Sequence, residues 1–343
     1  MNIDRLTRSG ALLLGLLAAG LTYSGAQAHE GGIGGTGISA YGPIQRFGSI
    51  FVNGVEYPLA GARITVDGRL ANRAALRLGQ VVLVHAVLRG TLQVRSVAVR
   101  HAVQGPVTRI AGNRITVFGQ HITVPLGLAA RTGRGRRVAT LRVGDVVRVS
   151  GLRRGRARWQ AMRITRLYPV GHLPRVYPVL LRATLHRVRG HRLRMGHALV
   201  VWRVRGSGSA RFVGQRVLAK GFMQGRAVEI TYVASDTLAL GPSGTRVHLA
   251  GYLRGRPGAW HADGIAVGIS KSARFTPGLV DLDGVVSARG ILVVRSVRPD
   301  DLPESPVPER VPHPAARPPV ISRPEIEQPH LAFPDIERPE IGR

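Results

Sequence analysis

Arginine side chains gather between residues 131 and 166, where Asp145 is the only acid. Guanidinium groups match the oxygens of phosphate, sulfate and carboxylate groups with paired hydrogen bonds. Two segments, RGRR at 134–137 and RRGR at 153–156, interleave arginine with glycine, which leaves the backbone open to a phosphate. The candidate anion-binding residues are Arg131, Arg134, Arg136, Arg137, Arg153, Arg154, Arg156 and Arg158.

Trp159 lies within the same arginine-rich stretch. An aromatic ring on such a surface can stack on a base or a sugar. The alternative is that Trp159 packs inside a small barrel, with no role in binding. We therefore take Trp159 as a candidate stacking residue and leave both interpretations open.

Other side chains form no recognisable catalytic or metal-binding pattern. The motifs G-x-S-x-G, H-E-x-x-H and S-x-x-K are absent, and Asp281 and Asp283 are interpreted as flanking a turn at Gly284. His186, His191 and His197 have arginine neighbours that repel a cation, so they are interpreted as surface residues. We expect a protein that is not an enzyme and that has no metal site and no cofactor.

The first 28 residues have the pattern of a secretory signal peptide. Arg5 and Arg8 precede an apolar run from Ala11 to Leu21, and Ala26-Gln27-Ala28 is an A-x-A cleavage site. The apolar run is shorter than the roughly 20 residues that span a bilayer, so no transmembrane insertion is expected. The sequence predicts a mature chain that begins at His29 and is periplasmic or secreted, and the absence of cysteine excludes disulfides.

Charge is divided unevenly along the 343 residues. From Gly31 to Arg298 there are 42 basic and 8 acidic residues, a net charge of +34, and only Lys220 and Lys271 are lysines. The segment 299–343 has 5 basic and 9 acidic residues, a net charge of −4, and holds 12 of the 22 prolines. Proline at this density prevents helix and interior strand, so a disordered, acidic tail is expected there.

The body repeats a pattern of short strands and tight turns. One unit opens at Gly42 with GPIQRFGSIFVNGVEYPL, and the next opens at Gly105 with GPVTRIAGNRITVFGQHITVPL. The peptides LRLG at 76–79 and LRVG at 141–144 align one to one, and a third and a more degenerate fourth unit follow. The predicted organisation is a signal peptide at 1–28, a Gly-rich leader at 29–41, repeats at 42–104 and 105–168, a linker at 169–181, repeats at 182–240 and 241–298, and the tail at 299–343.

Each unit has the length of about five short strands, which we expect to close into a small barrel because closure buries one face and removes the edges. We predict an all-β chain of tandem OB-like barrels, with a sandwich as the alternative. The only helix expected is in short segments near 71–78 and 138–141.

The repeated openings and the L-x-x-G peptides resemble those of bacterial secreted proteins with repeats of domain-of-unknown-function family 5666. The resemblance is good from Gly31 to Leu167 and weaker beyond. It implies repeated small β-barrels in the cell envelope and no catalytic residue or established ligand.

These features lead to three functional hypotheses. The first is an exported, non-enzymatic protein that binds a polyanionic envelope component (lipopolysaccharide or anionic polysaccharide) or extracellular nucleic acid through arginine-rich barrel surfaces. The second is an envelope scaffold that binds a protein partner through its proline-rich tail. The third and weakest is an oligonucleotide-binding OB-like protein.

Overall fold

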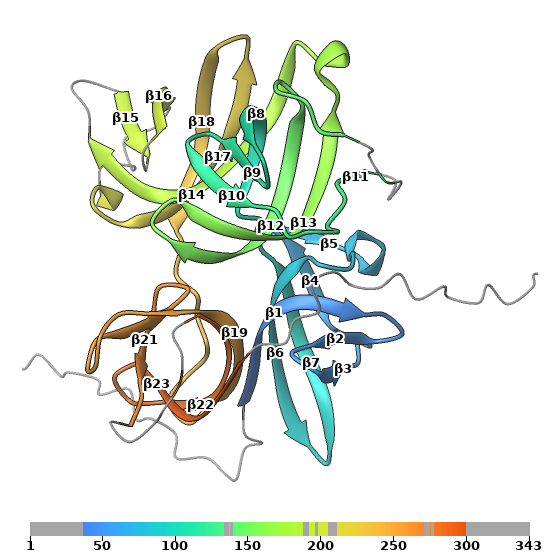
Figure 1. Cartoon of the computed structure of the whole chain (residues 1–343). Helices are drawn as coiled ribbons and strands as arrows, with labels where there is room; N and C mark the ends of the chain where they lie inside the picture. Colours follow the sequence, from blue (N-terminus) through green and yellow to red (C-terminus); the bar gives the residue numbers. More distant parts are fainter. Residues whose placement is uncertain are drawn as a thin grey trace, which may run out of the picture. The chain divides into compact units, whose positions relative to one another are not determined.

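The computed structural model of the chain describes residues 37–133, 137, 140–187, 192–195, 198–204, 211–270, 275 and 278–299 (Figure 1). All of them belong to one compact unit, Met1–Pro306. The predicted signal peptide, nearly all of the predicted tail, Arg134, Arg136, His191 and His197 lie outside the described residues. Apart from two short 3-10 helices, the regular secondary structure of the described part is β-strand, as predicted from the repeats.

The first repeat is a five-part sheet with an added hairpin. Its elements are β1 (Gly37–Arg46), β2 (Ile50–Val52), β3 (Val55–Tyr57), β4 (Arg63–Val66), β5 (Arg69–Ala71), the 3-10 helix η1 (Arg73–Ala75), β6 (Val81–Arg89) and β7 (Thr91–Val99). Strand β4 runs parallel to β7, and β1 pairs with both β2 and β6. Because β3 pairs only with β2, this repeat does not close into a complete ring.

The other three repeats are closed five-stranded rings. Repeat 2 contains β8 (Val103–Ala111), β9 (Arg114–Val117), β10 (Gln120–Thr123), the short β11 (Arg131–Thr132), β12 (Val146–Gly155) and β13 (Arg158–Tyr168), followed by the 3-10 helix η2 (Val170–His172). Repeat 3 contains β14 (Val176–Arg187), β15 (Arg192–Met195), β16 (Ala198–Val204), β17 (Arg216–Gln224) and β18 (Ala227–Ser235). Repeat 4 contains β19 (Arg246–Arg254), β20 (Trp260–Ala262), β21 (Ile265–Gly268), β22 (Leu279–Val286) and β23 (Leu292–Pro299).

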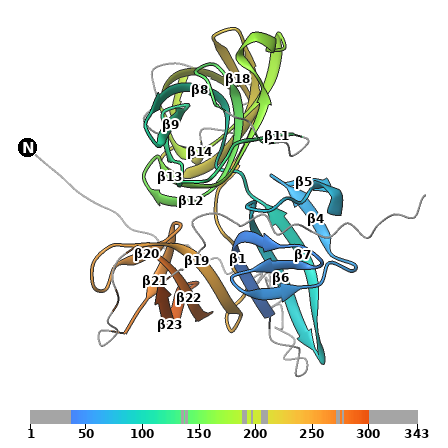
Figure 2. The same ribbon diagram turned by 45° about the vertical axis from the view of Figure 1, so that its right-hand side comes forward.

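The strand order is the same in all three rings. The first strand pairs with the second and the second with the third, which runs parallel to the fifth, and the fourth strand joins the fifth back to the first. This is the Greek-key arrangement of an OB-like barrel, and it excludes the sandwich alternative. The ring of repeat 4 is seen nearly end-on in Figure 1, and that of repeat 2 in Figure 2.

Alternation of apolar and polar residues places one face of each strand in a barrel core. Along β22, for example, Val280, Leu282, Gly284 and Val286 are buried and the residues between them are partly exposed. The aligned L-x-x-G peptides end in Gly79 and Gly144, which adopt φ of 75° and 94°. Their amides donate to the carbonyls of Ile44 and Val107 at 2.8 Å. The same turn therefore fixes β6 against β1 in repeat 1 and β12 against β8 in repeat 2.

Strands also pair between repeats. The first strand of repeat 1, β1, runs parallel to β19 of repeat 4, with Ile38 opposite Arg246. Strand β8 of repeat 2 pairs antiparallel with β14 of repeat 3, with Leu181 opposite Val103. These pairings join repeats 1 and 4 into one 12-stranded sheet and repeats 2 and 3 into one 11-stranded sheet.

Three sequence-based boundaries need correction. The predicted leader ends too late, because β1 begins at Gly37 and pairs with β6 from that residue onward. The predicted linker at 169–181 is too long, because β14 begins at Val176 and accommodates Pro178 within its pairing to β17. The supposed turn at Gly284 is wrong: Asp281 and Asp283 lie inside β22, which has a β-bulge at that glycine.

Candidate anion-binding site

The predicted anion-binding residues that lie in the β12–β13 hairpin divide into two kinds. Arg154, Arg156 and Arg158 are exposed, although the Arg154 guanidinium lies 5.0 Å from the ring centroid of Tyr252 in repeat 4. Arg137 is also exposed, whereas Arg131 is half-buried in β11. The exposed members are therefore positioned to meet an external anion, and most of them sit at one hairpin.

Arg153 is less exposed than the other candidate arginines of this hairpin. Its side chain is half-buried, and its Nε donates to the carbonyl oxygen of Gly155 at 3.1 Å. Burial, together with the neighbouring charge of Arg216 in repeat 3, lowers the pKa of Arg153 to about 10. Arg153 is therefore less open to an external anion than the three exposed candidates, and its binding of one stays a prediction.

Trp159 is not available as a stacking platform. Only 3% of the residue is exposed, and its indole Nε1 donates to Gln120 Oε1 at 3.0 Å inside the barrel of repeat 2. Alternation along β13 explains this placement, since Trp159 and Ala161 both lie in the core, and Ile164 joins them after a β-bulge. Of the two interpretations left open by the sequence, the structure supports the core residue.

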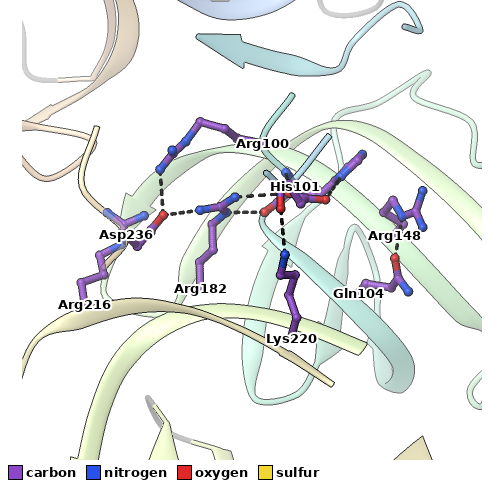
Figure 3. Close-up of polar contacts among 9 residues, drawn as sticks. Arg100, His101, Gln104, Arg148, Arg182, Arg216, Lys220 and Asp236 are labelled. Atoms are coloured by element: carbon purple, nitrogen blue, oxygen red, sulfur yellow. Dashed lines mark hydrogen bonds and ion pairs between the residues drawn. The ribbon is translucent and has the colours of Figure 1, made fainter. Parts of the chain in front are cut away.

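A buried network of acids and arginines joins repeats 1, 3 and 4. Asp236, which follows β18, accepts hydrogen bonds from Arg100 at 2.7 Å and from Arg182, and lies 2.8 Å from Arg216 Nε (Figure 3). Arg216 also approaches Asp263 in the β20–β21 turn at 3.8 Å. Arg182 is only 5% exposed, so its buried charge depends on Asp236 and on a second acid.

The tip of the β4–β5 hairpin supplies the second acid of this network. Asp67 and Gly68 adopt φ of 50° and 83°, the conformation of a tight hairpin turn. Asp67 accepts from His101 at 2.6 Å and from Arg182 at 3.2 Å. Arg182 therefore bridges Asp67 of repeat 1 and Asp236 of repeat 3.

The surrounding groups hold both carboxylates in the ionised state. Burial alone would raise the pKa of Asp67, but its interactions with His101 and Arg182 outweigh burial and hold that pKa well below its usual range. Burial likewise opposes ionisation of Asp236, and the charges of Arg182, Arg216 and Arg100 lower its pKa. The network is therefore an ionised cluster in which buried arginines hold the repeats together through ion pairs.

A cleft of about 390 Å³ opens beside this network. Its walls come from the β4–β5 hairpin of repeat 1, from β8 and β12 of repeat 2, and from the outer face of β14, β17 and β18 of repeat 3. Three cationic side chains line it, namely Arg69, Arg148 and Lys220. Two aromatic residues also line it, and both are well exposed: Phe222 at 44% and Tyr232 at 49%.

Hydrogen bonds fix two of the three cations of the cleft, Lys220 and Arg148. Lys220 Nζ donates to the backbone oxygen of Asp67 at 3.0 Å and lies 4.2 Å from the ring centroid of Tyr232. Arg148 Nε donates to Gln104 Oε1 at 2.5 Å, and Gln104 in turn donates to the carbonyl of Pro178 at 2.7 Å (Figure 3). Partial burial, followed by the nearby charge of Arg69, lowers the pKa of Lys220.

Sequence reasoning missed this cleft, although one signal was present. In β17, Val217 and Ala219 are core residues, so Lys220 and Phe222 fall on the opposite, outward face. An aromatic residue on the polar face of a strand, two positions from one of the two lysines in the chain, marks an unusual surface. The approach of the repeat 1 hairpin to that surface depends on contacts between repeats, which strand periodicity does not encode.

The sequence of repeat 2, which contains β8 to β13, matches a known family. Residues 104–165 match the family model of DUF5666, a domain of unknown function. The DUF5666 match covers repeat 2 and confirms the resemblance inferred from the repeated openings and L-x-x-G peptides. No curated protein matches the chain significantly.

A solved structure titled "drosophila Unr CSD456" aligns with 59% of this chain and 98% of its own length, at 14% sequence identity and a TM-score of 0.19. A superposition this loose carries no argument about function, and the OB-like assignment rests on the strand pairing.

In the part of the chain that the structure describes, no helix is long and apolar enough to cross a membrane. No group of three His, Cys, Asp or Glu side chains among those residues is arranged to hold a metal ion.

Proposed function

We propose that this chain is an exported, non-enzymatic protein that binds polyanions through its arginine-rich exterior. One observation carries the proposal: most acids of the described residues are paired within the fold, whereas many arginines are exposed. Five carboxylates of the described residues form ion pairs within the fold, and they belong to Asp67, Asp145, Asp236, Asp263 and Asp283. The surface therefore keeps most of the positive charge of a body with a net charge of +34.

Electrostatics gives the proposal its mechanism. Exposed guanidinium groups at the β12–β13 hairpin form paired hydrogen bonds with phosphate, sulfate or carboxylate oxygens, and binding releases the counterions of the polyanion. That much like charge on one surface repels itself, and a polyanionic partner relieves the repulsion. Suitable partners are lipopolysaccharide phosphates, anionic polysaccharide and extracellular DNA.

The test is binding of the purified mature chain, residues 29–343, to labelled heparin, with uncharged dextran of similar length as the control. We expect heparin affinity to fall steeply between about 50 mM and 200 mM salt, and dextran not to bind. Equal affinity for heparin and dextran, or no binding of heparin at the lower salt concentration, would refute the proposal.

Export is the second part of the proposal and has its own test. The signal sequence motivates it, because the A-x-A peptide places cleavage after Ala28. N-terminal sequencing of protein recovered from periplasm or medium is expected to begin at His29. Recovery from the cytoplasm with Met1 intact would remove the envelope partners from consideration.

A further inference from the structure

The cleft between repeats 1, 2 and 3 differs from the rest of the basic surface because it combines cations with open aromatic rings. Arg69, Arg148 and Lys220 line the same space as Phe222 and Tyr232. Lysine and arginine alone bind any polyanion, whereas an exposed ring adds a flat apolar face. The lining therefore selects a ligand that carries both negative charge and flat, stackable groups.

The two rings are placed so that each keeps an open face. Lys220 lies directly opposite Tyr232 in the β17–β18 pairing and approaches its ring at 4.2 Å. With 49% of Tyr232 exposed, the other face of the ring remains available. Phe222 follows Lys220 by two residues on the same face of β17, about 7 Å further along the strand. The cleft thus alternates ring, cation and ring.

No carboxylate in the cleft opposes an anion directly. Asp67 is the one acid among the lining residues described, and His101 and Arg182 engage its two carboxylate oxygens. Its backbone oxygen is used as well, since it accepts from Lys220. An entering phosphate therefore meets cations whose acidic neighbour is already neutralised.

We propose that this cleft binds single-stranded nucleic acid, with bases stacked on Phe222 and Tyr232 and phosphates held by Arg69, Arg148 and Lys220. A duplex keeps its bases stacked on each other and offers only phosphates, so it cannot use the rings. A volume of about 390 Å³ suits a short stretch of strand, within the range of small-ligand pockets. This inference rests on the proposed polyanion binding and names a ligand class for one part of the surface.

The test compares two labelled strands of equal charge, an oligothymidylate about eight nucleotides long and an abasic strand of the same length. The intact mature chain is expected to bind the oligothymidylate at least about tenfold more tightly, because base–aromatic stacking adds to the phosphate contacts. In the double variant Phe222→Ala with Tyr232→Ala, this preference is expected to disappear, while heparin affinity stays unchanged. Both residues are exposed, so the fold tolerates their truncation.

Matched control variants isolate the cleft from the rest of the surface. Phe47→Ala removes a ring that is 45% exposed in the β1–β2 turn and does not line the cleft, so the preference for bases is expected to remain. Arg69→Gln is expected to weaken the oligothymidylate and the abasic strand by the same factor, and by more than Arg95→Gln, which changes an exposed arginine of β7.

The outcomes separate this inference from the proposed function. Equal binding of the two strands, or a preference that survives loss of both rings, would overturn the cleft inference even if heparin binds with a steep salt dependence. Loss of heparin affinity in the ring variant would also overturn it, because the occupant would then be a glycan. Failure of the intact chain to bind any of the three polyanions would remove the proposed function itself.

Discussion

Arginine plays opposite roles in the buried junction and on the β12–β13 hairpin. At the junction, Arg182 is 5% exposed and bridges Asp67 and Asp236, so its charge is neutralised inside the protein. On the hairpin, Arg156 and Arg158 are exposed, and an external anion can reach them. An arginine count therefore measures neither binding nor stability, because burial and the position of a few acids decide which role each arginine plays.

The largest effect is expected from removing the acid at the centre of the junction. Asp236→Asn leaves Arg100, Arg182 and Arg216 without their shared carboxylate, and breaking a buried ion pair costs about 3–5 kcal/mol. The free energy of unfolding, measured in urea, is expected to fall by that amount. Glu56→Gln, at an exposed position of β3, serves as the control and is expected to change stability by less than about 0.5 kcal/mol. Equal stability of the two variants would contradict the junction as described.

Acid is expected to act on the same carboxylates. The pKa values of Asp67 and Asp236 are lowered in the folded protein, so the unfolded chain binds protons first as the pH falls. Their contribution to stability is complete above about pH 5 and is lost progressively below it. Urea unfolding at a series of pH values is the measurement, and the variant Asp67→Asn with Asp236→Asn should show a flatter acid limb. An acid limb of unchanged steepness in that variant would assign the effect to other groups.

A third prediction distinguishes Arg153 from Arg156, two candidate anion-binding residues of the same hairpin. Arg153→Gln removes a half-buried charge that burial and Arg216 disfavour, so it is expected to raise the free energy of unfolding by about 1 kcal/mol, net of the lost hydrogen bond to Gly155. Arg156→Gln changes an exposed side chain, and is expected to stay within about 0.5 kcal/mol of the parent protein. Thermal or urea unfolding of both variants checks the contrast, which would disappear if Arg153 faced solvent.

The smallest effect concerns the carboxylate of Asp281, which is partly buried. Asp281 Oδ1 in β22 is buried without a hydrogen-bond partner, and burial raises the pKa of Asp281 to about 6. Because the folded state then binds the proton more tightly than the unfolded state, this group destabilises the fold above about pH 6 and not near pH 4. Asp281→Asn is expected to stabilise the protein by about 1 kcal/mol at pH 8 and to have no stabilising effect near pH 4. Destabilisation by this variant at pH 8 would mean that the charged form of Asp281 is favoured in the fold.

Much of the fold followed from residues whose role is local. The aligned Gly79 and Gly144 do occupy positive φ at matching turns, and Asn53-Gly54 forms the tight turn that joins β2 to β3. Alternating strands and equal repeat lengths predicted the OB-like barrels, because closure is the economical way to bury one face of five short strands.

The arrangement of the repeats and the role of single arginines could not be read from the sequence. Pairing of β1 with β19 joins segments about 200 residues apart, and edge pairing has no periodicity of its own. Arg153 and Arg154 are adjacent in β12 and fall on opposite faces, but which face is the less exposed one depends on packing against the other repeats. Trp159 could be assigned only once the register of β13 placed it in the core.

Polyanion binding by the outward-facing arginines is tested most directly by the salt dependence of binding to B-form DNA. The intact mature chain is compared with a variant in which Arg154, Arg156 and Arg158 are changed to Gln. We predict a linear fall of log affinity with log salt in the intact chain, and in the variant a slope reduced by up to about 0.9 for each phosphate that is no longer neutralised. Unfolding stability is expected to be retained, since these three side chains are exposed. An identical slope in the two proteins would show that the outward-facing arginines of the hairpin do not bind the polyanion.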